Sequence, residues 1–484
     1  MLEEIAGYLP QVEDEDIEYK TLTFHGNDET VHVKVPMLTN QQMNKVTDKV
    51  KTASKEVLKS RTVSEMVTII DKAIEQLIDR KNPYRQKAEK LLPIVTGYDQ
   101  ELVRLGLTSY LKTFRKQQLQ RFLIEDLGNP GLLDDFQPRA KRGFSKAVGP
   151  DLTVHVWAGN VPGLPLWSLI SGLLVKSGNI GKVSSSEPVF AGLFAQLLVE
   201  IEPSLSDCLA VVWWKGGDKD RERYLFDVAD VVVGYGGNKS LDSLRSRIPI
   251  TTRFLPFGHK LSFGILSKAS LDTRKAWKTA HDAAYDVIRY DQQGCYSPHI
   301  FYVQRGGRVS PKEFAYYLAH ELACFEKRYP RRELTIEEAS SLAEWRQKEE
   351  FASYTDREKE IIGDDTGAWT VVFENIGGAF TPSSLNRSIK VVGFDQFDEV
   401  ISEVTPYRSY LQTVGIAATP DELFKVGGLL GNIGVTRISG LGSMTSPEAG
   451  WHHDGRFNLL DLINMVDIED SAEDYAEALA PYVD

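Results

Sequence analysis

The chain has 484 residues, a formal net charge of −12 and a hydrophobic fraction of 42%. This length allows two or three domains with a large buried core, and the composition is ordinary for a soluble globular protein. Proteins that bind nucleic acids or anionic membranes need clustered Lys and Arg. The acidic balance therefore argues against both kinds of partner.

Three cysteines, Cys208, Cys295 and Cys324, are too few for a disulfide framework, and their odd number leaves one over. A reducing compartment is the simpler interpretation. The N-terminus lacks the basic stretch and apolar core of a signal peptide. The longest apolar run, 161–175, is short for a bilayer and is broken by glycine and proline. We therefore expect a cytoplasmic protein without a transmembrane segment.

The predicted elements begin with a hairpin over residues 19–35, where hydrophobic residues alternate on both sides of a Gly-Asn-Asp turn. From Thr39 to about Leu127 apolar residues recur at helical spacing. Within this helical block (residues 39–127), Thr62 followed by Glu65 is a candidate capping box. We interpret the block as packed helices with no chemistry of its own.

From about Asp151 the pattern changes to strands alternating with helices. The predicted strands are 152–157, 178–183, 208–214 and 228–233, and the predicted helices are 166–174 and 188–201. A second α/β region begins near Leu261, the charged segment 332–364 is predicted as an exposed helical excursion, and the acidic end 467–484 as a solvated helix or tail. Such alternation predicts doubly wound parallel sheets.

The sharpest feature for chemistry is the stretch from Asp291 to His299, with Cys295 at its centre. A cysteine preceded by glycine and followed by proline belongs on a turn, where backbone N–H groups can hold both a thiolate and an oxyanion. Cys295 is therefore a candidate nucleophile, with a half-exposed inert thiol as the alternative. Cys208, in a strand pattern, and Cys324, in a helical run, are predicted to be buried small hydrophobic residues.

A glycine-rich loop follows the strand predicted at 228–233. Gly234, Gly236 and Gly237 precede a helix, so backbone amides there could approach a phosphate. Lys239 stands where the dinucleotide-binding fingerprint requires a third glycine. Taken alone, the loop fits a plain strand-to-helix turn better than a cofactor site.

Taken in order, several segments make the chain resemble the aldehyde dehydrogenase superfamily and, within it, the LuxC-type acyl-CoA reductases of bacterial fatty acid reductase complexes. The matching segments are Trp157–Pro162, Lys176–Lys182, the Gly234 loop, Gly294-Cys295 and Trp451–Gly455. The resemblance implies an α/β fold with doubly wound parallel sheets in a cofactor domain and a catalytic domain. We expect the helical block and dinucleotide-binding domain in 1–262, the catalytic domain in 263–445, and a returning C-terminal segment and tail in 446–484.

The resemblance also implies roles for individual residues. Cys295 would form an acyl-enzyme thioester. Asn160 would give its side-chain amide to the oxyanion beside the backbone N–H of Cys295; otherwise it is a turn residue between strand and helix. Lys182 would hydrogen-bond the adenosine ribose of the cofactor, or else be a solvated lysine at a strand end. The three glycines of the 234–237 loop would lie by the pyrophosphate.

Two departures from the aldehyde-oxidising pattern bear on the reaction. The Glu-Leu-Gly-Gly motif of the superfamily, whose Glu activates the hydrolytic water, here begins with Pro256. Without that base the thioester should hydrolyse poorly, which favours an acyl reductase, unless His259 or His299 has taken over the role. Ser185 stands where NAD-preferring relatives often have Glu, so NADPH becomes acceptable. Glu187 is close enough to weaken this inference, and NADH stays possible.

Histidines provide the candidate proton carriers. His299 lies four residues beyond Cys295 and could protonate a departing thiolate or deprotonate Cys295. Pro298 makes a continuous helix through this stretch improbable, so the spacing alone does not bring the two side chains together. The tandem His452-His453 could reach the site on a returning segment, although a structural role fits the pattern better. No set of residues has metal-ligand spacing.

The sequence thus predicts reduction of an acyl-CoA or acyl-protein donor to an aldehyde by NADPH. LuxC-type relatives act on long-chain fatty acyl groups and assemble with acyltransferase and acyl-protein synthetase subunits, and we expect such partners and a homo-oligomer here. An acyl-phosphate reductase of the same superfamily and a non-catalytic subunit that keeps the fold are the alternatives.

Overall fold

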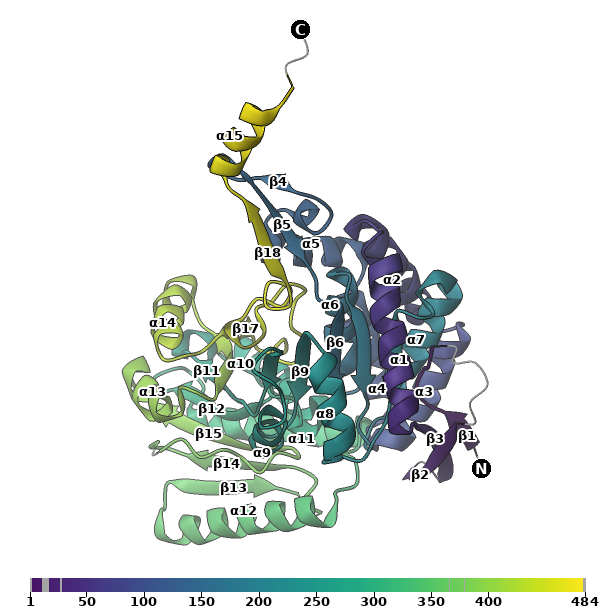
Figure 1. Ribbon diagram of the computed structural model, residues 1–484. Coiled ribbons are helices and arrows are strands. Elements are labelled where there is room, and N and C mark those ends of the chain that lie inside the picture. Colours follow the sequence, from purple (N-terminus) through teal and green to yellow (C-terminus); the bar gives the residue numbers. More distant parts are fainter. Residues whose placement is uncertain (1, 11–16, 27, 365, 378, 482–484) are drawn as a thin grey trace.

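The computed structural model describes residues 2–10, 17–26, 28–364, 366–377 and 379–481 (Figure 1). The predicted hairpin is confirmed: β2 (Glu18–Gly26) and β3 (Glu29–Met37) pair antiparallel, and β1 (Leu2–Ile5) joins β3 in parallel. Asn27 of its turn lies outside the described residues. Among the described residues, none of the helices combines the length and the hydrophobicity that a membrane span requires.

The helical block is also confirmed. It consists of α1 (Asn40–Ala53), α2 (Val63–Ile78), α3 (Pro83–Thr96), α4 (Gln100–Lys112) and α5 (Lys116–Leu127). The capping box at the start of α2 is present, because the Glu65 backbone N–H donates to the Thr62 hydroxyl at 3.2 Å and the Glu65 carboxylate accepts from the Thr62 N–H at 2.7 Å.

A five-stranded parallel sheet follows, in the order β10-β9-β6-β7-β8. Its strands are β6 (Leu152–Val156), β7 (Gly178–Lys182), β8 (Leu209–Val212), β9 (Val231–Tyr235) and β10 (Arg253–Phe257). Its helices are α6 (Leu164–Leu174), α7 (Phe190–Ile201), α8 (Lys219–Val228) and α9 (Asn238–Arg245). The strand predicted at 228–233 begins three residues later, because α8 extends to Val228.

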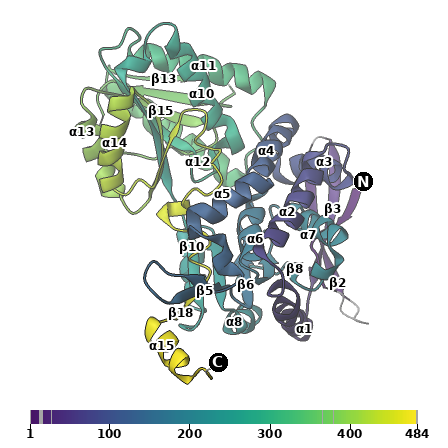
Figure 2. The same cartoon turned by 90° about the horizontal axis from the view of Figure 1, so that it is seen from above.

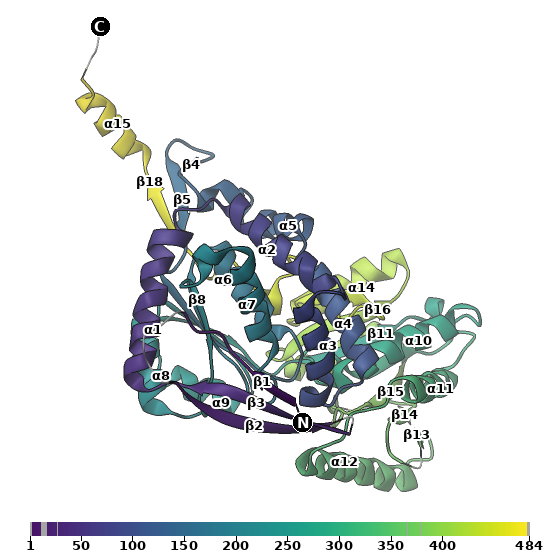
Figure 3. The ribbon, with the colours of Figure 1, turned by 90° about the vertical axis from the view of Figure 1, so that its right-hand side faces the viewer.

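Both faces of this sheet are covered, which explains its near-continuous apolar strands. One face packs against α1 and α8, where Val46 and Phe226 share a core with Val154. The other face packs against α6, α7 and the remaining helices of the block (Figures 2 and 3). The sheet is therefore held rigidly between layers, and its strand ends are fixed points on which a site can be built.

The second sheet has seven strands in the order β13-β14-β15-β12-β11-β16-β17. They are β11 (Leu261–Leu266), β12 (Pro298–Gln304), β13 (Lys359–Gly363), β14 (Thr370–Glu374), β15 (Ser388–Phe394), β16 (Leu411–Ala417) and β17 (Arg437–Gly440). Its helices are α10 (Lys275–Ile288), α11 (Pro311–Arg328), α12 (Ile336–Thr355), α13 (Phe397–Val404) and α14 (Pro420–Asn432). β13 is antiparallel to β14, and the other pairs are parallel.

Two peripheral features complete the fold. The excursion predicted at 332–364 is helical over α12 and largely exposed, but it ends in β13, an edge strand that was not predicted. Near the C-terminus, β18 (Asn464–Ile468) pairs with β5 (Phe144–Val148), which also pairs with β4 (Gln137–Pro138). The exposed helix α15 (Asp470–Leu479) then projects from the body, as predicted for the acidic tail; residues 482–484 of that tail lie outside the described ranges (Figure 1).

The two cysteines predicted to be buried differ. Cys208 is fully buried, as predicted, whereas Cys324 is exposed, so that prediction was wrong. The reason is the helical phase of α11: Cys324 follows the exposed Tyr316 and His320 at intervals of four residues, which places all three on the solvent side.

Candidate active site

A cleft of about 1380 Å³ lies where the helical block, both sheets and the C-terminal segment meet. The last residues of four parallel strands line it: Val156 of β6, Lys182 of β7, Tyr235 of β9 and Phe257 of β10. Ligands of open α/β sheets bind outside the carboxyl ends of the strands. The cleft occupies this position, and Cys295 lines it from the other side.

The cleft brings most of the sequence-predicted site residues together. Its walls include Cys295, Asn160, His299, Lys182, Gly236 and Gly237. Ser185 instead accepts a hydrogen bond from the Trp213 indole at 3.0 Å, and its neighbours Ser184 and Ser186 line the cleft. Gly234 lies inside β9, where a Cβ would meet Leu241 and Phe254 at 3.1 Å. Packing of β9 against α9 and β10 therefore explains the glycine at this position.

The segment that carries the nucleophile candidate has an unusual backbone. In this cysteine turn (residues 289–296), Tyr290, Asp291 and Gln292 all have positive φ angles, of 50°, 46° and 63°. Left-handed backbone costs most non-glycine residues about 1–2 kcal/mol each, so three in succession require strong external support. The turn directs the chain from the end of α10 to Cys295 and then into β12.

A second left-handed segment, Leu385–Arg387, supplies part of that support. The Asn386 backbone N–H donates to the Asp291 carbonyl at 3.1 Å, and its side-chain oxygen accepts from the Gln293 amide at 3.0 Å. The Gln292 amide donates to the carbonyls of Pro298 and Ser388 at 2.8 and 2.9 Å. The two irregular segments therefore satisfy each other's polar groups.

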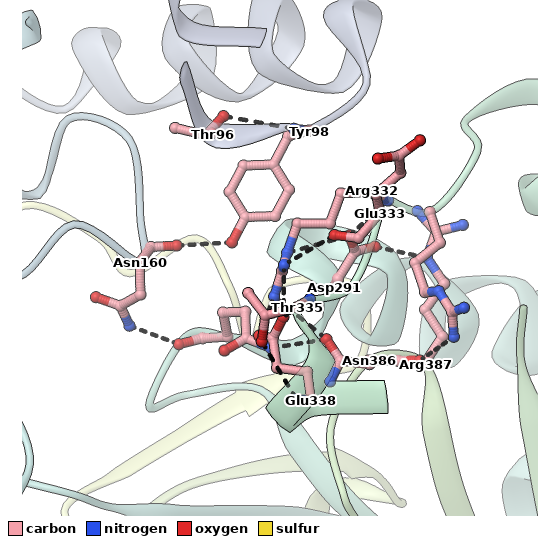
Figure 4. Close-up of polar contacts among 12 residues, drawn as sticks. Thr96, Tyr98, Asn160, Asp291, Arg332, Glu333, Thr335, Glu338, Asn386 and Arg387 are labelled. Atoms are coloured by element: carbon pink, nitrogen blue, oxygen red, sulfur yellow. Dashed lines mark hydrogen bonds and ion pairs between the residues drawn. The ribbon is translucent and has the colours of Figure 1, made fainter. Parts of the chain in front are cut away.

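Ion pairs also stabilise the cysteine turn. The Asp291 carboxylate accepts from the Arg387 guanidinium at 2.7 Å, and both side chains are at most 2% exposed. Its second oxygen accepts from the Arg332 backbone N–H at 3.2 Å (Figure 4). Arg387 also donates to Glu326 at 2.6 Å, so the buried guanidinium is shared between two carboxylates.

Asn160 is tied to the cysteine turn. Its side-chain Nδ2 donates to the Gln293 carbonyl at 2.7 Å, which leaves the second hydrogen of the amide for a substrate oxygen. Its own backbone carbonyl accepts from the Tyr98 hydroxyl at 2.8 Å (Figure 4). Tyr98 and several residues of α4 and α5 line the cleft. The helical block thus helps to build the site, contrary to the expectation that it has no chemistry of its own.

Cys295 itself is half-buried. Its carbonyl accepts from the Ser262 hydroxyl at 2.9 Å, and its sulfur accepts from the Gln412 side-chain amide at 3.4 Å. Burial, together with the nearby Asp454 carboxylate, raises the pKa of the thiol to about 11, although the Gln412 hydrogen bond and Lys260 act in the opposite direction. Neither Gln412 nor Asp454 was a candidate in the sequence, because both are distant from Cys295 along the chain.

Three histidines line the cleft: His259, His299 and His453. The His299 ring shares a hydrogen bond with the Ser383 hydroxyl at 3.2 Å, and burial lowers the pKa of His299 to about 4. The C-terminal segment does return to the site, since His453 stacks on Phe257 with ring centroids 4.4 Å apart. Burial also lowers the pKa of His453 to about 4. Burial lowers the pKa of His259 as well, so all three rings are neutral near pH 7.

The part of the cleft next to the five-stranded sheet suits a dinucleotide. Among the described residues lining it, Lys182, Lys239 and Arg247 are basic and Glu222 is acidic. Arg247 forms an ion pair with the buried Glu222, and burial lowers the pKa of Lys182 while Glu222 opposes that shift. A Cβ on Gly237, just before α9, would meet nothing within 4 Å, so a phosphate could approach the helix N-terminus.

Glu187 does not compete for this space. Its carboxylate accepts from the backbone N–H groups of Val189 and Phe190 at 2.8 and 2.9 Å, at the start of α7. Glu187 therefore caps the N-terminus of α7, and its negative charge interacts with the dipole of that helix.

These features, a thiol on a braced turn facing the carboxyl edge of a doubly wound sheet, define the aldehyde dehydrogenase class of fold. The aldehyde dehydrogenase KauB from Pseudomonas aeruginosa superposes with a TM-score of 0.73 at 14% identity, covering 96% of each chain. Aldehyde dehydrogenase 21 from Physcomitrella patens gives a TM-score of 0.72 at 14% identity, covering 96% of this chain and 98% of that one. The predicted α/β class is thus confirmed.

The sequence narrows the class to a family. Residues 58–465 match the family described as acyl-CoA reductase (LuxC), and the chain belongs to that family. The long-chain acyl-protein thioester reductase of Photobacterium phosphoreum is 25% identical over 458 residues, covering 93% of this chain and 88% of the relative. The enzyme of the same name from Aliivibrio fischeri is 27% identical over 415 residues, covering 85% and 82%. This protein is therefore an oxidoreductase of the acyl-reductase type.

Proposed function

We propose that this protein reduces a long-chain acyl thioester to the aldehyde with NADPH, through an acyl-enzyme thioester on Cys295. The observation that carries the proposal is the placement of Cys295 on a turn braced by Asp291 and tied to Asn160, inside a cleft at the carboxyl edge of the sheet. A nucleophile needs this combination of access and fixed position.

The reaction follows from the residues around the sulfur. The Cys295 sulfur bonds to the acyl carbon, the donor's carbon–sulfur bond breaks, and the donor leaves as a thiol with the proton that Cys295 gave up. The Asn160 amide and the Cys295 backbone N–H hold the negative oxygen. NADPH, when bound, supplies a hydride to the thioester carbon. The bond to Cys295 then breaks, the aldehyde leaves, and a proton from water restores the thiol.

Reduction is favoured over hydrolysis by the residue at the position of the superfamily's base. Pro256 occupies that position, near the end of β10. Its side chain has no hydrogen-bond donor or acceptor, so it cannot take a proton from water. His259 and His299 line the same cleft and could activate water instead. The ratio of aldehyde to free acid released from an acyl donor measures the outcome, and a predominance of acid would contradict the proposal.

The basic residues of the cofactor part of the cleft support NADPH. A 2′-phosphate would meet Lys182 and Arg247, and the negative charge of Glu222 is already paired with Arg247. Arg247→Ala should therefore weaken NADPH binding, followed by nucleotide fluorescence, about tenfold more than NADH binding. Arg245→Ala, at the exposed end of α9 and two residues before Arg247, is the matched control. Equal losses for both nucleotides would contradict the preference.

The names of the relatives support a long-chain acyl group carried by a protein, and the description of the family supports one carried by CoA. Tyr110, Trp167 and Trp451 line the cleft and offer aromatic walls to an alkyl chain. An acyl-protein donor would also bring acyl-transferring and acyl-activating subunits to this face, and we extend the proposal to such partners and to a homo-oligomer.

The donor class is tested by assaying fatty acyl-CoA and fatty acyl phosphate side by side, with aldehyde as the measured product. We expect aldehyde from the thioester and its loss in Cys295→Ala. Faster reduction of the acyl phosphate would identify an acyl-phosphate reductase. NADPH binding without any aldehyde from either donor would indicate a non-catalytic subunit.

A further inference from the structure

We propose that Gln412 is a catalytic residue that donates a hydrogen bond to the Cys295 thiolate, and that Asp454 is the positioning residue that orients the Gln412 amide. The inference rests on the proposed role of Cys295 as the nucleophile. It assigns a function to two buried polar side chains behind the Cys295 sulfur that the proposed reaction does not otherwise use.

The geometry fixes which end of the amide faces the sulfur. The Gln412 Nε2 atom lies 3.4 Å from the Cys295 Sγ and 2.6 Å from the Asp454 Oδ1. A carboxylate can only accept a hydrogen bond, so the atom between it and the sulfur must be the amide nitrogen. One of its two hydrogens then points to Asp454 and the other to Cys295.

Both partners are held in place. Gln412 lies near the start of β16 and is fully buried, and the Thr413 hydroxyl donates to its Oε1 at 3.5 Å. Asp454 belongs to the C-terminal segment, has a left-handed φ of 54° and a side chain only 8% exposed. The Lys260 ammonium lies 3.9 Å from its second oxygen. The amide therefore has little freedom to turn away from the sulfur.

The two residues act on the sulfur in opposite ways. An N–H that points at sulfur stabilises the thiolate relative to the thiol, so Gln412 lowers the pKa of Cys295, whereas the negative charge of Asp454 raises it. Lys260 also lowers the pKa. Arg437, Tyr235 and Tyr296 interact electrostatically with the same sulfur.

This arrangement suits a nucleophile that must also be a leaving group. The sulfur is anionic when it attacks the donor, neutral as the thioester, and anionic again when the aldehyde departs. A donor aimed at the sulfur stabilises the two anionic states more than the neutral one, and so assists both steps. The carboxylate of Asp454 is useful only because it orients that donor.

The test measures the ionisation of Cys295 directly. The rate of alkylation by iodoacetamide is followed against pH in the full-length Cys324→Ser variant, and peptide mass spectrometry identifies the modified cysteine. Cys324 is exposed and would otherwise react, whereas Cys208 is fully buried. The assay requires neither an acyl donor nor NADPH.

Gln412→Leu in this background should slow alkylation about tenfold at pH 8, equivalent to a rise of about one pKa unit. Gln412→Met, which also lacks a donor, gives the same test if the leucine variant fails to fold. Asp454→Asn keeps an acceptor for the Gln412 amide and removes the charge, so alkylation should become faster. Opposite shifts distinguish these roles from a purely structural one, which would change both rates in the same direction.

An unchanged pH profile in a folded Gln412→Leu or Gln412→Met variant would overturn the proposal, as would slower alkylation in Asp454→Asn. Failure of the proposed function is recognised separately. If the alkylation shifts appear but no acyl-enzyme forms, the assignment of Gln412 to the sulfur stands and the reduction chemistry fails.

Discussion

Asp291→Ala should destabilise the protein and misplace Cys295 at the same time. The substitution removes one carboxylate from the buried Arg387 guanidinium, and breaking such a pair costs about 3–5 kcal/mol. The three left-handed residues of the cysteine turn store a comparable strain, together about 3–6 kcal/mol. Without Asp291 this strain is no longer offset, and the turn relaxes.

This loss of stability can be expressed as a fall in the melting temperature, Tm. Unfolding entropy of about 2.1 cal/mol/K per residue gives about 1 kcal/mol per kelvin for 484 residues, so Tm should fall by about 3–5 °C. A displacement of the nucleophile by about 1 Å lowers turnover by about 10²-fold. Thermal unfolding and the single-turnover rate of Cys295 acylation measure the two effects on the same sample.

Asp474→Ala is the matched control, because its ion pair with Arg142 is exposed on both sides. Ion pairs that are exposed on both sides contribute little to stability, so its Tm should change by less than about 1 °C. A fall of 3–5 °C in Asp291→Ala with an unchanged acylation rate would refute the idea that the ion pair positions the nucleophile. An unchanged Tm would refute the strain argument.

Three further predictions concern the same site. Asn160→Ala should lower turnover by about 10²-fold if the amide stabilises the oxyanion, and wild-type turnover would leave Asn160 as a turn residue. Tyr98→Phe removes the hydroxyl that holds the Asn160 carbonyl; a net hydrogen bond of about 0.5–1.5 kcal/mol predicts an acylation that is about 2- to 13-fold slower, and an unaffected rate would contradict this role. Because burial and Asp454 raise the pKa of Cys295 to about 11, the acylation rate should increase with pH between 7 and 9; a flat profile would show that another group limits attack.

Much of the fold could be predicted because its signals are local. In a sequence, parallel strands that are covered on both faces appear as short apolar runs. This pattern predicted the strands around Val154 and Ile180. Errors arose where the phase or length of a charged element decided the outcome. Because α8 extends to Val228, β9 begins later than predicted. The helical phase of α11 places Cys324 on the exposed side of that helix.

The site was only partly predictable, for a related reason. Cys295 is marked by the glycine and proline around it, and Asn160 by its resemblance to a family motif. Gln412 occupies a strand in which a buried amide carries no local signal, and it acquires meaning only through contacts with residues 117 and 42 positions away. Tyr98 reaches Asn160 across 62 residues. Such partnerships depend on tertiary structure.

The most direct test of the account is the mass of the intact protein after exposure to a mixture of fatty acyl-CoAs without nucleotide. We predict one added acyl group, mapped to Cys295 by peptide analysis and discharged as aldehyde when NADPH is supplied. An acyl group on another residue, or a wild-type level of labelling in Cys295→Ala, would contradict the central claim.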